Sequence, residues 1–177
     1  MPGKDFLVDP SEIDYCNVVA DIEAIRLLNP QRDAMQQLTA IVYDDPKTHI
    51  AIGYKDISDD TSNPEFWHSG HMPGVPLMPG VIMCEAAAQV CSYHSRRHDL
   101  LRCEVVGFGG LNNVKFRGIV LPGDRLTIVC QMTKLRRGKM FTCRFEEFVG
   151  ENLVCEGEIR CIPLPINELR ANATARH

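Results

Sequence analysis

The sequence predicts an α+β protein in which one antiparallel sheet wraps around a single long helix. Residues 79–97 have helical spacing and are apolar almost all round, so this helix must be enclosed on every side. The last third of the chain alternates polar and apolar residues in runs separated by glycine-bearing turns, a pattern typical of antiparallel strands. These strands are the only material available to enclose the helix, and 177 residues correspond to one domain.

A helix and a hairpin are predicted in the first half of the chain. Residues 17–28 carry apolar side chains at helical spacing. Two strands are expected at 38–43 and 49–55, joined by a polar turn that starts at Asp44 and contains a proline. A polar loop with several prolines follows over residues 56–76.

The second half begins with the long helix and continues as a meander of strands. Proline 79 starts the helix, which ends near Arg97. Strands are predicted at 125–136, around residues 141–145 and at 153–161. We therefore expect three parts in the chain: an N-terminal extension (1–16), a single domain (17–162) and a polar C-terminal tail (163–177).

Composition and charge exclude several classes of protein. With 45% apolar and 24% charged residues, the chain is neither disordered nor collagen-like. A formal net charge of −4 argues against a general nucleic-acid-binding protein, since such proteins are normally basic. The start lacks the apolar segment of a signal peptide, and no stretch reaches the roughly 18 to 20 apolar residues of a spanning helix. We expect a cytoplasmic protein without a membrane partner.

Eight cysteines are the one unusual feature of the composition. They include no Cys-x-x-Cys pair, and cytosolic thiols stay reduced, so we interpret them as small core residues. The residues that could form a metal site on the long helix are Cys84, Cys91, His94 and His98. The first and last of these lie about 21 Å apart along one helix, too far to surround one ion, so no metal site is predicted.

Charge is distributed unevenly along the chain. Residues 1–65 hold 13 acidic and 5 basic side chains, whereas residues 112–144 hold one acidic and eight basic side chains. The basic segment is interpreted either as the solvated face of a strand pair or as a docking surface for an acidic partner.

Three groups that can act together in proton chemistry occur within fifteen residues. Glu85 lies on the apolar helix one turn before Gln89, with no Lys or Arg within seven residues, and burial without a cation favours a protonated carboxyl group. His71 lies in a loop restricted by glycine and proline. The Gly80 amide, at the helix start, can polarise a carbonyl oxygen. This set favours proton abstraction next to a carbonyl, although a tertiary arginine paired with Glu85 or a structural His71 remains open.

The segment that carries these groups closely resembles a known signature. It reads His71-Met-Pro-Gly-Val-Pro-Leu-Met-Pro-Gly-Val-Ile-Met-Cys-Glu85-Ala-Ala-Ala-Gln89. The 3-hydroxyacyl-[acyl-carrier-protein] dehydratases of fatty-acid synthesis, FabZ and the related FabA, have the same fourteen-residue step from His to Glu. Residues 114–126, with Phe-Arg and Pro-Gly-Asp, and residues 21–30 are similar to two further segments of that family, so the resemblance covers about residues 20–162.

The resemblance implies a fold, a site and a reaction. The fold is the hotdog, which dimerises edge to edge, with the histidine of one chain and the carboxylate of the other in each active site. His71 would be the base that removes the C2 proton, Glu85 the acid that protonates the 3-hydroxyl, and Gly80 the amide that binds the thioester oxygen. Gln89 would hold Glu85 in position. A (3R)-hydroxyacyl thioester would lose water to give the trans-2-enoyl product, and neither a metal nor a redox cofactor is required.

Two departures from the family pattern affect the surroundings of these groups. Met72 replaces the phenylalanine after the histidine, and residues 30–35 (Pro-Gln-Arg-Asp-Ala-Met) replace a block that reads Pro-His-Arg-Tyr/Phe-Pro-Phe in the family. They leave open the shape of the acyl pocket, the N-terminal packing and the carrier, but do not alter His71, Gly80 or Glu85.

The expected partners are a phosphopantetheine-linked acyl carrier protein and further copies of the chain, as a homodimer or a trimer of dimers. Because the carrier is acidic, the basic segment could dock it, and the side chains at its centre are Arg136, Arg137 and Lys139. Another hotdog enzyme, such as a thioesterase or an acyl-CoA hydratase, and a non-catalytic acyl-binding subunit are the alternatives.

Overall fold

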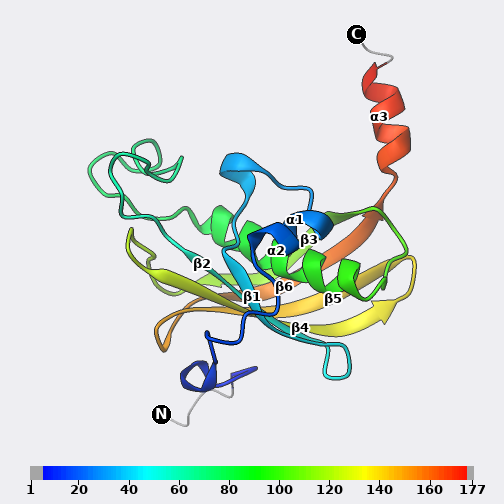
Figure 1. The fold of residues 1–177 in the computed structure, drawn as a ribbon, viewed down its shortest axis with the longest axis horizontal. Helices are drawn as coiled ribbons and strands as arrows, with labels where there is room; N and C mark the ends of the chain where they lie inside the picture. The colour runs from blue at the N-terminus through cyan, green and yellow to red at the C-terminus, as the bar shows by residue number, and fades with distance from the viewer. Residues whose placement is uncertain (1–5, 175–177) are drawn as a thin grey trace.

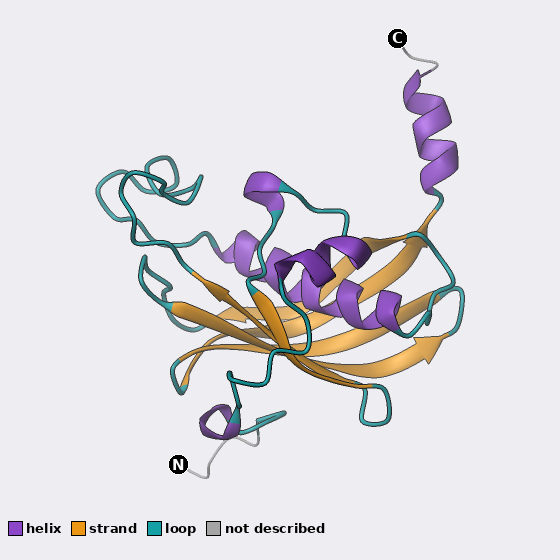
Figure 2. Ribbon diagram, in the orientation of Figure 1, coloured by secondary structure: helices purple, strands orange, loops and turns teal. Residues whose placement is uncertain are grey.

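The computed structural model describes residues 6–174 and shows a curved sheet with one long helix against its concave face (Figures 1 and 2). The elements in chain order are η1 (Pro10–Glu12), α1 (Ile22–Leu28), η2 (Asp33–Met35), β1 (Ala40–Asp45), β2 (Ile50–Asp56), α2 (Gly80–Arg97), β3 (Val105–Phe116), β4 (Arg125–Arg136), β5 (Met140–Val149), β6 (Asn152–Leu164) and α3 (Ile166–Thr174).

The six strands form one sheet in the order β1-β2-β4-β5-β6-β3, and every neighbouring pair is antiparallel. Strands β4, β5 and β6 form the predicted meander, and β4 has the predicted bounds. Strand β3 lies at the edge beside β6, so its other side has no strand partner within the described chain. The predicted α+β arrangement, one sheet around one helix, is confirmed.

Helix α2 is enclosed as its apolar composition predicts. Eleven of its 18 residues are buried, and it packs on β2, β3, β4, β5 and β6. Small side chains at Ala86, Ala87 and Cys91 allow the sheet to approach closely, while Tyr93 fills the space further along the helix. Six of the cysteines are buried and free, which agrees with their predicted place in the core. Among the described helices, none is long and apolar enough to cross a membrane.

Several element boundaries differ from the prediction. Helix α1 starts only at Ile22, because the Asp21 side chain caps the Ala24 amide while Ala20 forms an isolated bridge with Ile41. Asp44, expected in a turn, belongs to β1 and pairs with Ala51 of β2. Four elements were not predicted: the short helices η1 and η2, the edge strand β3, and the helix α3, which projects away from the sheet (Figure 1).

The first described residues pack on the convex face of the sheet, opposite α2 (Figure 1). Phe6 meets Phe148 edge to face at 5.1 Å between ring centroids, and the Leu7 amide donates to Glu146 at 2.8 Å. Tyr15 shares a 2.8 Å hydrogen bond with Thr127. The segment predicted as an extension therefore covers apolar side chains of the central strands.

Glycines shape the surface of the edge strand β3. A Cβ atom at Gly107 would lie 2.5 Å from the Leu164 side chain, and one at Gly109 would lie 3.0 Å from Ile162. Side chains of β6 thus lie across β3 where its own side chains are missing. The missing alternation at these glycines, and two bulges between β3 and β6, explain why the strand escaped prediction.

Candidate active site

The start of α2 presents free backbone amides. Pro79 is the N-cap and offers no side-chain acceptor, and no hydrogen bond within the described residues uses the amides of Gly80 or Val81. The Phe116 ring covers Gly80 so closely that a Cβ atom there would lie 2.6 Å from the ring. Gly80 therefore keeps its amide accessible beside an aromatic wall that leaves no room for a side chain.

Glu85 is half-buried one turn further along α2, and two amide groups hold it. Its Oε1 accepts hydrogen bonds from Nε2 of Gln89 at 2.8 Å and from Nε2 of Gln31 at 3.3 Å. No ion pair involves Glu85 within residues 6–174, so the alternative of a tertiary arginine partner is not realised there. The carboxyl group is positioned by neutral donors.

The carboxamide of Gln89 is itself oriented by the backbone. Its Oε1 accepts from the Gln37 amide at 2.9 Å, and its Nε2 donates to the Met35 carbonyl at 2.7 Å as well as to Glu85. These two backbone contacts have opposite polarity, so only one orientation of the carboxamide satisfies both. Gln89, 1% exposed, is thereby fixed as a donor to the carboxyl group.

A cavity of about 220 Å³ opens beside Glu85. Its walls come from the start of β3, the end of β6, α2 and the segment after α1, and they are mostly apolar: Pro30, Gln31, Glu85, Ala88, Ser92, Val105, Val106, Gly107, Phe108, Cys161 and Leu164. The polar groups that meet the cavity are few, and Glu85 is the one titratable oxygen acid among them. Such a cavity suits an apolar chain with one reacting polar position.

His71 is exposed on the loop before α2 and does not reach Glu85 within one chain. Its amide donates to the Trp67 carbonyl at 3.0 Å, and Trp67 is buried, so the loop is anchored close to the histidine. Residues that flank it, Met72 and Val75, are also exposed. Of the sequence-predicted site, the described chain therefore brings together Glu85, Gln89 and the start of α2, while His71 remains apart.

The predicted docking residues lie at the turn between β4 and β5. The Gly138 amide donates to Leu100 just beyond the end of α2, so this turn lies at the opposite end of the helix from Gly80. Other bases of the segment are neutralised: Arg117, Arg125 and Arg144 form ion pairs with Glu156, Asp56 and Glu146. A cavity of about 430 Å³ beside the turn is lined by Lys134, Arg136 and Lys139 of this segment and by Arg160 of β6.

Two histidines at the C-terminal end of α2, His94 and the C-cap residue His98, contact an aspartate and not the cysteines of the rejected metal site. Asp44, whose side chain is fully buried, contacts Nδ1 of His94 at 2.5 Å and Nε2 of His98 at 2.8 Å. Arg97 adds an ion pair at 3.2 Å. Asp44, His94 and His98 form the one group in the described residues with the spacing of metal ligands. Hydrogen bonds and the ion pair account for this arrangement.

A further buried carboxyl group lies beneath the start of α2 and was not foreseen. Glu147 of β5 is 0% exposed, and neither oxygen has a hydrogen-bond partner within residues 6–174. Burial, and to a smaller extent the neighbouring Cys84, raises the pKa of Glu147 well above its ordinary value. The nearby Cys155 thiol lowers this pKa, but by less. Burial therefore favours the neutral form of this carboxyl group.

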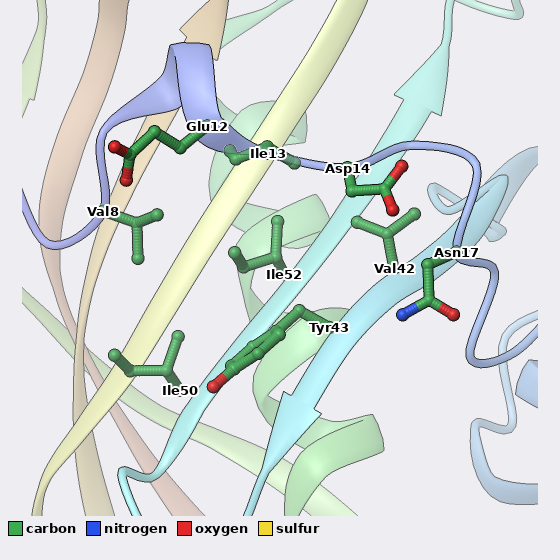
Figure 3. A pocket seen from close by; sticks show the side chains of 9 residues that line it. All are labelled: Val8, Glu12, Ile13, Asp14, Asn17, Val42, Tyr43, Ile50 and Ile52. Carbon is green, nitrogen blue, oxygen red and sulfur yellow. The ribbon is translucent and has the colours of Figure 1, made fainter.

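A further cavity, of about 300 Å³, lies on the convex face of the sheet under the N-terminal segment (Figure 3). Ile50 and Ile52 of β2 form its floor, and Glu12 and Asp14 lie at its rim. None of the predicted site residues lines it. The cavity beside Glu85 is smaller, but a predicted catalytic residue lines it.

Comparison with known proteins identifies close relatives in sequence. The sequence model of the FabA-like domain matches residues 29–158. The chain is 38% identical over 109 residues, which are 62% of its length and 73% of the relative, to the 3-hydroxyacyl-[acyl-carrier-protein] dehydratase FabZ of Moorella thermoacetica. The same identity and coverage are found for the FabZ dehydratase of Clostridioides difficile.

Comparison of structures supports the fold independently. The dehydratase heterocomplex ApeI:P from Xenorhabdus doucetiae superposes with a TM-score of 0.68 at 16% identity, covering 84% of this chain and 96% of the other. A sigma28-regulated virulence protein from Campylobacter jejuni gives 0.61 at 15% identity, covering 86% and 96%. At these identities the likeness concerns the fold.

Proposed function

This chain belongs to the FabA-like family of hotdog dehydratases, and we propose that it converts (3R)-hydroxyacyl-[acyl-carrier-protein] to the trans-2-enoyl thioester in fatty-acid biosynthesis. The observation that carries the proposal is the geometry of Glu85, which two amides hold at the wall of an apolar cavity one turn after the free amide of Gly80. FabZ relatives that are 38% identical support the same reaction.

The proposed elimination uses three groups of the chain. The neutral His71 imidazole takes the C2 proton, and the C–H electrons form the C2–C3 double bond as the C3–O bond breaks. The Gly80 amide donates to the thioester oxygen, which carries the developing negative charge. Glu85 protonates the departing hydroxyl, so that water leaves, and transfer of the proton from His71 back to the carboxylate restores the starting state.

Each active site in this proposal combines two chains. Strand β3 has a free edge with Phe108, Leu111 and Phe116 all at least 40% exposed, and such an edge can pair with a second copy. His71 of one protomer would then serve Glu85 of its partner, which accounts for their separation within one chain. A homodimer is the minimal active unit, and a trimer of dimers is compatible with it.

Mixing two inactive variants tests this arrangement. Chains with His71→Ala and chains with Glu85→Gln, carrying different affinity tags, are unfolded together and refolded, and the hybrid is verified by both tags. A random mixture contains one intact site in every second dimer, so about a quarter of wild-type activity should return. A verified hybrid without activity would refute the shared site.

The basic turn between β4 and β5 is proposed to dock the acidic carrier. Its cations carry no ion pair within the described residues, unlike those of Arg117, Arg125 and Arg144. Arg136→Glu combined with Arg137→Glu, or Lys139→Glu, should raise KM for carrier-linked substrate at low salt and leave KM for a coenzyme A thioester unchanged. Lys47→Glu, on the turn between β1 and β2, is the control. Equal KM values for all variants would exclude this dock.

The decisive experiment follows water elimination from 3-hydroxyacyl carrier substrates of several chain lengths. Wild type should form the conjugated enoyl thioester, whereas His71→Ala and Glu85→Gln should each lower kcat by about 10²- to 10⁴-fold, the usual contribution of a general acid or base. Glu151→Gln, the same change on the exposed turn before β6, should retain full activity. Unchanged rates in both site variants, or release of a free thiol by hydrolysis, would overturn the proposal.

A further inference from the structure

Gln31 joins the site although its sequence position had no assigned role. It follows α1, and its Nε2 donates to Oε1 of Glu85 at 3.3 Å, while its side chain lines the cavity beside that carboxyl group. The reverse orientation of the carboxamide would direct two acceptor oxygens at each other, so the nitrogen of Gln31 faces Oε1 of Glu85.

The backbone around Gln31 is fixed by hydrogen bonds within its own segment and by one hydrogen bond to α2. The Arg32 guanidinium donates to the carbonyls of Arg26, Asn29 and Gln31 at 2.7 to 2.8 Å. The Asn29 side chain donates to the Gln89 carbonyl at 2.9 Å, and Asn29 is 3% exposed. The segment is therefore fixed to the turn of α2 that carries the acid, and the Gln31 side chain starts from a defined position.

The two amide donors on Glu85 distinguish its oxygens. Nε2 of Gln89 and Nε2 of Gln31 both point at Oε1. An oxygen that already accepts two N–H groups is a poor site for a proton, because the protonated oxygen would lose at least one of these bonds. When Glu85 is protonated, these two contacts therefore favour the proton on Oε2.

The other end of the Gln31 carboxamide lacks a partner. Its Oε1 is buried, and no described residue donates a hydrogen bond to it. A buried acceptor without a donor costs free energy, which a ligand that brings an N–H or O–H group can recover. In the elimination, the 3-hydroxyl must lie next to Glu85 to receive its proton, and the hydrogen already on that hydroxyl needs an acceptor within reach.

We propose that Gln31 binds the hydrogen of the leaving 3-hydroxyl through its Oε1, while its Nε2 and Gln89 direct the proton of Glu85 to Oε2. Gln31 thus positions the acid and selects 3-hydroxyacyl over saturated acyl thioesters. This inference rests on the dehydratase function proposed above. It assigns to one side chain both a contact with the catalytic acid and a contact with the group that departs.

The test compares two ligands that differ only in the hydroxyl group. In a His71→Ala background, which blocks turnover with Glu85 intact, dissociation constants are measured for a 3-hydroxyacyl carrier and for its saturated analogue. The hydroxyl should tighten binding about 5- to 10-fold, and Gln31→Leu should abolish this gap without changing the affinity for the saturated ligand. Gln31→His, whose neutral ring keeps one donor and one acceptor, should restore part of the gap.

Kinetics and a matched variant complete the experiment. With His71 present, Gln31→Leu should lower kcat about 10- to 100-fold. The control is Gln36→Leu, because Gln36 in the same segment contacts Arg26 and does not line the cavity. Wild type that eliminates no water refutes the dehydratase function. If wild type is active but Gln31→Leu still binds the 3-hydroxyacyl carrier more tightly than the saturated analogue by the same factor, the role of Gln31 is refuted and the dehydratase function stands. The same holds if Gln31→Leu weakens the binding of both ligands equally.

Discussion

Replacing the buried Glu147 with methionine should stabilise the protein, and the gain should depend on pH. Glu147 is 0% exposed, and burial raises the pKa of its carboxyl group well above the ordinary value. Each pH unit above the ordinary pKa of a glutamate, about 4.3, adds at most about 1.4 kcal/mol to the cost of keeping its carboxyl group protonated. Methionine has a similar length, fills the same space and carries no such cost.

The sign of the pH dependence follows from linkage. Because the folded state raises the pKa of Glu147, its favourable contribution is complete below the pKa of the unfolded chain and is lost as pH rises towards the folded pKa. Between pH 5.5 and pH 7.5, the advantage of Glu147→Met over wild type should therefore grow, by at most about 2.7 kcal/mol, which is the limit for one proton over two pH units. The effect of changed packing is the same at both pH values, and the titration of other groups is the same in both proteins. Both effects therefore cancel when the stability gain at pH 5.5 is subtracted from the gain at pH 7.5.

Urea unfolding at the two pH values measures the effect. The single tryptophan, Trp67, is buried at 3% exposure and reports unfolding by fluorescence, and protomer concentration is held constant because a dimer gains stability with concentration. Glu151→Met, at an exposed turn, is the control and should show the same stability difference at both pH values. An equal gain for Glu147→Met at both pH values would show that this carboxyl group is ionised in the fold and would refute the argument.

Two further substitutions probe the ends of α2. Gly80→Ala places a Cβ atom 2.6 Å from the Phe116 ring, so the ring and the Gly80 amide must move, and we expect kcat/KM to fall at least tenfold. Combination with Phe116→Ala should recover part of this loss. An unchanged kcat/KM in Gly80→Ala would contradict the expectation. Asp44→Asn removes the charge that His94, His98 and Arg97 share, so the free energy of unfolding should fall by about 2 kcal/mol and the melting temperature by about 4 to 8 °C. A melting temperature within 1 °C of wild type, measured by calorimetry at about the same protein concentration, would contradict the second expectation.

The sequence was informative where local pattern and tertiary burial agree. The all-round apolar character of residues 80–97 required an enclosing sheet, and the alternation in β4 to β6 supplied one. The pairing of Glu85 with Gln89 followed from helical spacing alone, since the two residues are one turn apart. These features depend on periodicity, which a single sequence displays.

Other features depend on contacts between distant segments and could not be read from periodicity. Gln31 reaches Glu85 across 54 positions because Arg32 fixes the chain after α1, and nothing in the local sequence indicates this. Alternation in β5 places Glu147 on the same buried face as Phe145. The sequence does not show, however, that Cys84 of α2 lies beside this carboxyl group or that both of its oxygens are buried. The separation of His71 from Glu85 within one chain was implied by the family resemblance and not by the spacing of the motif.

Leu164 lies between the projecting C-terminal helix and the cavity beside Glu85. This residue is the last of β6, occupies the space above Gly107, and forms part of the wall beside Glu85. Helix α3 begins two residues later, at Ile166, and extends away from the sheet (Figure 1). Helix α3 is therefore joined to the cavity wall through a single residue, Pro165, and a partner that displaced α3 together with the end of β6 would change the width of this cavity.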